Sequence, residues 1–226
     1  GNLHSHTTRS DGKLTPDESV AAFKAHGYDF LALTEHNRYT RFEQYNTKDF
    51  ITIQGVEGDV YLKDGQWRVY HFIFLPTGER GFTPTKPMLS HDDVMDNPTL
   101  DTMDDIQAYI DDMRDRGYMT MINHPHWSTL EYDDILPLKN LFGVEILNFC
   151  SWYTENMGES NVLWDALLRR GMKIWGTATD DNHNWHPIDS QYCDSFGGYI
   201  QVKAKELSEQ AICQAIWDGS FYASTG

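Results

Sequence analysis

Histidines and carboxylates recur at the ends of short apolar runs along this 226-residue chain. The chain opens with His4 and His6 two positions apart, followed by the turn-like triplet Ser10-Asp11-Gly12. Side chains of an extended strand alternate with a period of two, so His4 and His6 point to the same side and form a bidentate clamp. Asp181 and His183 repeat this spacing late in the chain. Two such pairs with mixed nitrogen and oxygen donors favour a bound metal.

Six of the ten histidines lie in or just after apolar runs: His4, His6, His36, His71, His124 and His183. The carboxyl ends of parallel strands meet at one edge of an α/β sheet, so one architecture would bring all six to the same rim. A donor set of His, Asp and Glu without Cys suits divalent metals of intermediate hardness, such as Zn, Mn or Fe.

Glu57 and His71 lie on two arms of a predicted hairpin that turns near Asp64-Gly65. A two-residue loop would put Glu57 and His71 on opposite faces of the ribbon. A three-residue, bulged loop pairs Leu62 with Gln66 instead. Glu57 then lies directly across from His71 on the same face, and we predict this bulged form.

The elements that position these residues follow from hydrophobic periodicity. Seven apolar runs predict strands, at residues 30–34, 50–56, 69–75, 118–123, 143–149, 172–178 and 198–204. Helical spacing of apolar residues predicts helices around 106–113, 163–170 and 207–216. A further helix is predicted to begin at Pro16, with Thr15 as N-cap and Glu18 closing a capping box. The alternation predicts an α/β protein with a parallel sheet, wound open or closed as a barrel.

The chain is expected to form one domain over residues 1–226, with 76–104 as an insertion or lid. It begins at Gly1 without a methionine, so a trimmed export signal and a cytoplasmic location both stay open. A further domain after residue 226 is compatible with the abrupt end.

Composition limits the possible partners. The chain has 18 basic and 34 acidic residues, for a formal charge of −16, which disfavours long nucleic acids. No apolar run approaches the roughly 20 residues of a membrane helix. Cys150, Cys193 and Cys213 are odd in number and widely spaced, so free thiols are expected.

Five short motifs follow one another along the chain: LHSHTTRSDG, LALTEHN, GVEG, NHP and TDDNH. In these motifs the chain resembles the polymerase and histidinol phosphatase (PHP) family of metal-dependent phosphoesterases. The resemblance covers essentially the whole chain and implies a distorted (β/α)7 barrel with a cluster of up to three metal ions at the carboxyl rim. It implies nine metal ligands: His4, His6, Asp11, His36, Glu57, His71, His124, Asp181 and His183. Glu57 would bridge two metals, and Asp11 and His36 would lie near the third.

Two departures from the family pattern concern Glu35 and the residues after the H-P motif. Glu35 replaces the usual aspartate of T-D-H-N, and we expect it to affect how His36 is oriented. Many members that act on small molecules continue with a glycine and an arginine, where this chain has His126-Trp127. Glu145 is expected to be a buried partner of the ligands and not a ligand itself.

The expected activity is hydrolysis of a small phosphomonoester or short phosphodiester by a metal-bridging hydroxide, with two or three divalent ions of Zn, Mn or Fe. His126 or His186 could protonate the leaving oxygen, and Arg38 could contact phosphate. Trp127, Trp152 and Trp185 could wall the pocket. Two alternatives stay open: an amidohydrolase-type C–N hydrolase, and a non-catalytic, metal-dependent binder of phosphorylated ligands.

Overall fold

The computed structural model describes residues 1–63 and 67–225. The helices are α1 (Pro16–Ala25), η1 (Glu43–Tyr45), α2 (Met103–Asp115), α3 (Tyr132–Ile135), α4 (Phe149–Glu155), α5 (Asn161–Arg169) and α6 (Glu209–Trp217). The strands are β1 (Phe30–Leu33), β2 (Arg38–Tyr39), β3 (Ile51–Gln54), β4 (Val56–Lys63), β5 (Trp67–Pro76), β6 (Asp93–Val94), β7 (Thr99–Leu100), β8 (Tyr118–Ile122), β9 (Leu141–Asn148), β10 (Trp175–Thr179), β11 (Tyr199–Val202) and β12 (Phe221–Ser224).

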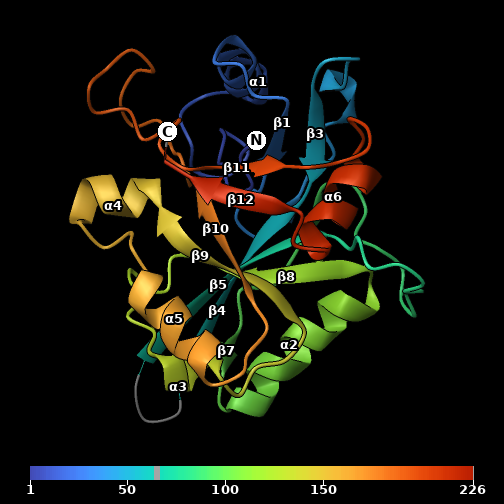
Figure 1. Cartoon of the computed structure of the whole chain (residues 1–226), viewed down its shortest axis with the longest axis vertical. Coiled ribbons are helices and arrows are strands. Elements are labelled where there is room, and N and C mark those ends of the chain that lie inside the picture. Colours follow the sequence, from blue (N-terminus) through green and yellow to red (C-terminus); the bar gives the residue numbers. More distant parts are fainter. Residues whose placement is uncertain (64–66, 226) are drawn as a thin grey trace.

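A six-stranded sheet in the order β10-β9-β8-β5-β4-β7 forms the centre of the molecule (Figure 1). Neighbouring strands are parallel in the pairs β10–β9, β9–β8 and β4–β7, whereas β5 runs antiparallel to both β4 and β8. β1 and β3 form a separate parallel pair. The fold is mixed α/β with a mostly parallel central sheet. The predicted (β/α)7 barrel is not confirmed, since β4 and β5 form a hairpin without an intervening helix.

Isolated bridges connect the opening residues to both ends of this arrangement. Asn2 bridges to Leu31 of β1, and Ser5 bridges to Asn182, which follows β10. A third bridge joins His36, just after β1, to Glu57 of β4. The first residues of the chain therefore lie between the ends of β1 and β10, where the carboxyl ends of several strands meet.

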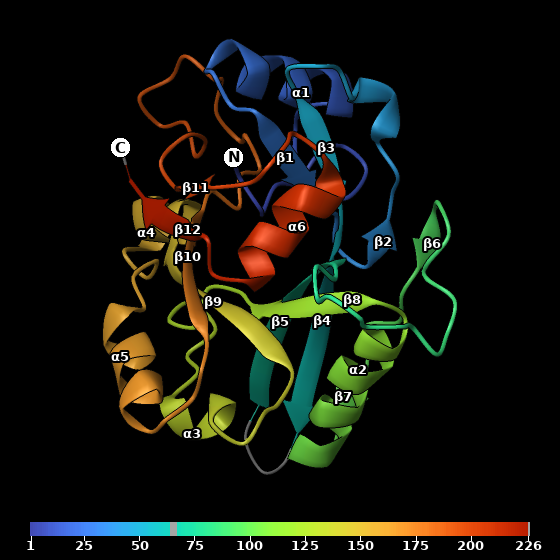
Figure 2. The same ribbon diagram turned by 45° about the vertical axis from the view of Figure 1, so that its right-hand side comes forward.

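The two faces of β5 separate two apolar clusters. Phe72 and Phe74 pack with α2 and α5 on one face, and Ile73 and Leu75 pack with residues of β1, β3 and α6 on the other. His71 belongs to the second face by its odd position along the strand. Figures 1 and 2 show α1 near one end of the long axis, and α2 and α5 near the other.

The main sequence-predicted elements are confirmed. Every predicted run contains a strand, and α1 begins at Pro16 with the predicted capping box between Thr15 and Glu18. The 76–104 segment carries β6, which pairs with β2, and β7, which pairs with β4 (Figure 2). Among the described residues, no helix is long and apolar enough to cross a membrane.

Candidate metal centre

The structure brings nine residues singled out in the sequence into one cluster, where each lies within 4 Å of another member. They are His4, His6, Asp11, His36, Glu57, His71, His124, Asp181 and His183. His4 and His6 come from the opening segment, Asp11 from the loop after it, and Glu57 and His71 from β4 and β5. His36, His124, Asp181 and His183 follow β1, β8 and β10. Metal ligation by these residues is a prediction that the geometry supports.

Four donor atoms at the centre of the cluster face one another. His4 Nε2 lies 3.2 Å from Glu57 Oε2 and 3.0 Å from Asp181 Oδ1. The corresponding distances from His6 Nε2 are 3.1 and 3.0 Å. Four ligands placed tetrahedrally at about 2.0–2.1 Å from one ion are about 3.3–3.4 Å apart, so the spacing fits a divalent metal.

The carboxylate oxygens of this group lack hydrogen bonds. Glu57 Oε2 and Asp181 Oδ1 are buried, and neither has a hydrogen-bond partner among the described residues. Buried oxygens without a partner are costly, because they have lost water and gained nothing in return. A cation among these atoms would remove that cost.

Hydrogen bonds at Nδ1 turn the Nε2 atoms of three histidines toward the carboxylates. His4 Nδ1 lies 2.7 Å from Glu145 Oε1, and since an ionised carboxylate only accepts, this nitrogen carries the proton. His183 Nδ1 donates to the backbone oxygen of Asp181 at 2.9 Å. His124 Nδ1 lies 3.2 Å from Ser128 Oγ. Such partners fix the tautomer and ring orientation that a metal ligand needs.

Glu57 presents its two oxygens to different histidines. Oε2 faces His4 and His6, and it lies 3.1 Å from His36 Nδ1. Oε1 lies 3.3 Å from His71 Nδ1 and 3.4 Å from His124 Nε2. This placement suits a carboxylate that bridges two ions.

Asp11 reaches the cluster from the turn after His6. Its Oδ2 lies 3.4 Å from His183 Nε2 and 3.7 Å from His36 Nε2, and its side chain is 49% exposed. The turn packs tightly: a Cβ at Gly12 would approach the His6 carbonyl carbon and oxygen to 2.6 Å. Glycine therefore lets the loop close on the opening segment and direct Asp11 back to the cluster.

Asp59 is a member of the site that the sequence analysis missed. Its Oδ1 accepts a hydrogen bond from His36 Nδ1 at 2.9 Å, and its Oδ2 accepts one from Asn37 Nδ2 at 2.7 Å. The Asp59 backbone N–H donates to Asn37 Oδ1 at 2.9 Å. His36 is thereby held with Nε2 toward Asp11. Asp59 lies two residues beyond Glu57 on β4, so the period of a strand would have placed it on the same face.

The predicted hairpin register was wrong by two residues. Leu62 pairs with Arg68, not with Gln66, and Glu57 pairs with Ile73. His71 lies opposite Asp59. A shift of two preserves the face, so Glu57 and His71 still share one side as predicted. The turn itself, residues 64–66, lies outside the described residues.

Glu35 acts on a different part of the site from the one expected. It is fully buried and accepts hydrogen bonds from Thr7 N at 3.1 Å, Thr7 Oγ1 at 2.5 Å and Ser10 Oγ at 2.6 Å. Its carboxylate thus holds the loop that carries Asp11. The expected effect on His36 is not observed, because Asp59 makes that contact.

Glu145 lies behind the histidines, as the sequence suggested. Besides His4, it accepts hydrogen bonds from the His124 backbone at 2.7 Å, from Asn148 Nδ2 at 2.9 Å and from Thr179 Oγ1 at 2.6 Å. All of its contacts are therefore to residues that carry or surround the cluster.

The carboxylates and histidines shift one another's pKa values. Burial alone would lower the pKa of His36, but Glu57 and Asp59 raise it to about 10. Burial likewise opposes the shift at His183, where Asp11 and Asp181 raise the pKa to about 9. Burial would raise the pKa of Asp11, but the neighbouring histidines, with His183 foremost, lower it to about 2. The histidines and carboxylates of the cluster therefore stabilise one another's charged forms.

A cavity of about 430 Å³ opens over the cluster. Asp11, His36, His71, His124, Asp181 and His183 line it, together with Trp127, Trp185 and residues of α4. Trp127 packs edge-on against His124, with ring centroids 5.0 Å apart, and the Lys13 ammonium lies 3.7 Å from the Trp185 ring centroid. Two of the three tryptophans thus lie where the sequence placed them. Trp152 lines a neighbouring hollow.

The predicted proton donors and phosphate contact lie outside this cavity. His126 lines the neighbouring hollow, and His186 is exposed and packs near Tyr192. Arg38 lies on β2, 3.8 Å from Asp92, and does not line the cavity. Each follows a ligand closely in sequence, but the chain turns away at that point.

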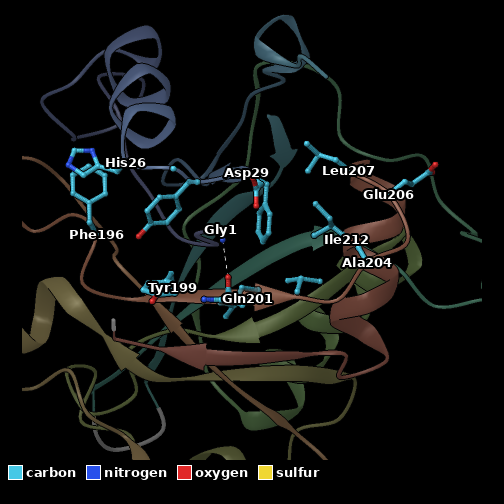
Figure 3. A pocket seen from close by; sticks show the side chains of 15 residues that line it. Gly1, His26, Asp29, Phe196, Tyr199, Gln201, Ala204, Glu206, Leu207 and Ile212 are labelled. Atoms are coloured by element: carbon cyan, nitrogen blue, oxygen red, sulfur yellow. Dashed lines mark hydrogen bonds between the residues drawn. The ribbon is translucent and has the colours of Figure 1, made fainter. Parts of the chain in front are cut away.

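A larger hollow, of about 740 Å³, lies away from the cluster (Figure 3). It lies between the start of β1 and β11, with His26 stacked on Phe196 at one side and Leu207 and Ile212 at the other. None of its lining residues belongs to a described group of metal-type donors. The cavity of about 430 Å³, which the metal-type donors line, is therefore the better candidate for a catalytic site.

Comparisons with known proteins agree on the kind of fold. No protein-family model and no curated protein matches the sequence. Among solved structures, a two-domain protein from Bacteroides vulgatus containing a predicted PHP-like metal-dependent phosphoesterase is similar at a TM-score of 0.56 and 17% identity. The match covers 99% of this chain and 63% of that protein, so this chain spans less than two thirds of its length.

Two further structures are similar. An amidohydrolase from Chromobacterium violaceum, with bound sulfate and no metal, gives a TM-score of 0.55 at 16% identity over 80% of this chain and 87% of that one. A putative metal-dependent phosphoesterase from Bifidobacterium adolescentis gives 0.50 at 13% identity over 84% and 88%. At such identities the likeness concerns the fold.

Proposed function

We propose that this chain, which shares its fold with PHP-like phosphoesterases and an amidohydrolase, is a metal-dependent hydrolase of phosphoesters related to the PHP family. The observation that carries the proposal is the convergence of His4 Nε2, His6 Nε2, Glu57 Oε2 and Asp181 Oδ1, with neither oxygen hydrogen-bonded within residues 1–63 and 67–225. The distorted barrel is part of this proposal. The opening segment and the ends of β1, β4, β8 and β10 would together form one rim of that barrel.

The donor groups support two or three divalent ions, with Zn, Mn or Fe as the candidates. His4, His6, Glu57 and Asp181 would hold one. Glu57 with His71 and His124 would hold a second, and Asp11 with His36 and His183 a third. Bound ions of this kind lower the pKa of water and neutralise phosphate charge.

The protein's own residues would bind and orient the substrate. No lysine or arginine lines the described cavity. The positive charge that neutralises the phosphate would therefore come from the metal ions held by the cluster. Trp127 and Trp185 would supply apolar surface on the cavity wall. A small phosphomonoester or short phosphodiester fits a cavity of about 430 Å³.

Hydrolysis of a C–N bond is a second candidate, favoured by the likeness to the amidohydrolase. Amidohydrolase-type barrels usually have a metal-bridging lysine, and no lysine is among the described residues that line the cavity over the cluster. We therefore rank phosphoester hydrolysis first.

Turnover assays with Mn²⁺ test the proposal. Metal-loaded protein is assayed against phosphomonoesters, short phosphodiesters and amides, with metal content measured on the same sample. We expect phosphoester turnover that disappears in His124→Ala and persists in His91→Ala, whose exposed imidazole lies outside the cavity. Turnover of amides alone would favour the second candidate. Metal-dependent binding of phosphorylated ligands without turnover would indicate a binding module.

A further inference from the structure

Asn148 is a fully buried asparagine at the end of β9, and its side-chain amide uses both of its donors and its oxygen. Nδ2 donates to Glu145 Oε2 at 2.9 Å and to Asp181 Oδ2 at 3.0 Å. Oδ1 accepts a hydrogen bond from the Ser151 backbone N–H at 3.0 Å, which caps α4. An amide turned end for end would place its oxygen against two carboxylates, so one orientation alone satisfies all three neighbours.

This amide completes a ring of contacts around the centre of the metal cluster. The members of the ring are His4, Glu145, Asn148 and Asp181, and all of them are buried. Behind the cluster, Glu145 Oε1 accepts from His4 Nδ1 at 2.7 Å, and Glu145 Oε2 accepts from Asn148. At the centre, His4 Nε2 and Asp181 Oδ1 lie 3.0 Å apart. The two residues that would hold the same ion are therefore also joined behind it.

The hydrogen bond from Asn148 distinguishes the two oxygens of Asp181. Oδ2 accepts from Asn148, whereas Oδ1 lies 3.0 Å from Nε2 of both His4 and His6. Asp181 follows β10 and has a φ of 54°, in the left-handed region, so the chain leaves the direction of the strand there. The strand alone therefore does not fix the direction of this side chain.

Asn148 can fix that direction because its own backbone is held on two sides. It pairs with Thr179 of β10, two residues before Asp181. Its backbone N–H donates to the Gly158 carbonyl oxygen at 2.9 Å. A Cβ at Gly158 would meet the Asn148 carbonyl oxygen, so glycine lets this loop pack directly on the end of β9. The amide is thus presented to Asp181 from a fixed position.

We infer that Asn148 is a positioning residue of the metal centre, which fixes the Asp181 carboxylate so that Oδ1 meets the ion held by His4 and His6. The inference rests on the metal centre of the proposed function and is independent of which bond the protein hydrolyses. Loss of this hydrogen bond has two opposing effects. A freed carboxylate turns away from the histidines, which weakens metal binding, and it becomes more basic, which strengthens binding. We expect the loss of orientation to dominate, as it does for the hydrogen-bond partners of other metal ligands.

Asn148→Ser tests this role because it separates the two ends of the amide. Serine is a favoured N-cap, so its hydroxyl can still accept from the Ser151 N–H, but it cannot donate to both carboxylates. We expect the Mn²⁺ affinity, measured by competition with a fluorescent chelator, to fall about 10–100-fold. Thr102→Ala is the matched control, because it removes the cap of α2, a helix that does not line the cavity. An affinity of Asn148→Ser equal to or above that of wild type would overturn the inference.

The absorption spectrum of bound Co²⁺ reports the coordination geometry. At saturating Co²⁺, the d–d bands of Asn148→Ser should differ in position or intensity from those of wild type. The bands of Thr102→Ala should match wild type, because loss of a helix cap lowers stability without moving a ligand. Identical spectra for all three proteins would contradict a role of Asn148 in orienting Asp181.

Metal binding without turnover separates this inference from the proposed function. If wild type binds Mn²⁺ more tightly than Asn148→Ser does, and neither protein hydrolyses a phosphoester, the positioning role is supported and the proposed function is contradicted. If phosphoesters are hydrolysed and Asn148→Ser keeps the affinity and spectrum of wild type, the positioning role alone is overturned. Should circular dichroism show that Asn148→Ser does not fold, Asn148→Thr takes its place, since it keeps a hydroxyl cap and leaves a smaller void.

Discussion

The imidazole of His4 donates from Nδ1 to Glu145 Oε1 across 2.7 Å, and its other nitrogen faces Glu57 and Asp181. Both residues of this pair are fully buried. Glu145 therefore determines which nitrogen of His4 is free to act as a ligand.

Replacing Glu145 should weaken metal binding without removing a ligand. In Glu145→Gln, one amide oxygen cannot accept all of the bonds that the carboxylate receives from His4, His124, Asn148 and Thr179. We expect the affinity for the tightest metal to fall about 10–100-fold. Competition against a fluorescent chelator measures this. Glu206→Gln, on the exposed loop before α6, is the control, and equal affinities for both variants would contradict the role of Glu145.

Asp59→Asn should deplete the outermost metal position selectively. Asp59 accepts at both oxygens, from His36 and Asn37, and an amide can accept at only one. His36 would lose its fixed orientation toward Asp11. We expect about one ion fewer per chain after dialysis against limiting Mn²⁺, measured by elemental analysis. A stoichiometry equal to wild type would show that Asp59 does not position His36.

Metal binding should release protons and strengthen with rising pH. In the metal-free protein the pKa of His36 is raised to about 10, and that of His183 to about 9, so both are protonated near neutrality. A metal must displace these protons, and its affinity should rise from pH 6 to 9. Calorimetry in buffers of different ionisation enthalpy counts the protons. An affinity independent of pH over this range would contradict ligation by these two histidines.

The same shifts predict how the metal-free protein responds to base. Both folded pKa values lie above the unfolded value of about 6.5. Their contribution to stability is therefore complete below about pH 6.5 and is lost as pH rises through the folded values of about 9 and 10. Urea midpoints of chelator-treated protein should fall between pH 7 and 10, whereas a rise would contradict the charge pairing.

Removal of metal should lower thermal stability. A ligand that binds only the folded state at 100 times its Kd adds about 2.7 kcal/mol. For a chain of this size that corresponds to a rise in Tm of about 5–10 °C. Thermal scans with EDTA and with excess Mn²⁺ measure the difference. The shift should become smaller in Asp181→Asn, which alters a ligand of one ion, and an undiminished shift would contradict the place of Asp181 at that ion.

Much of the cluster could be predicted from the sequence, because strand periodicity and sheet topology determine it. The period of two along a strand predicted that His4 and His6 lie on the same side. The rule that the carboxyl ends of parallel strands meet at one edge predicted that His36, His124 and Asp181 lie close together. The face shared by Glu57 and His71 was correct although the register was not, since an even shift preserves the face.

The remaining features depend on tertiary contacts that no local pattern encodes. His126 points into another hollow because the turn after His124 is tied to Ser160, which is distant in sequence. Glu35 contacts Thr7 and Ser10 because the opening loop folds over it. Asp59 is the exception, since its spacing from Glu57 would have revealed it.

Anomalous diffraction from crystals grown in Mn²⁺ tests most directly whether these residues form a metal centre. We expect a difference peak about 2.0–2.2 Å from His4 Nε2, His6 Nε2, Glu57 Oε2 and Asp181 Oδ1. Further peaks are expected beside His71 and His124, and beside Asp11 and His183. A map at saturating Mn²⁺ with no peak among the first four atoms would contradict the proposed centre.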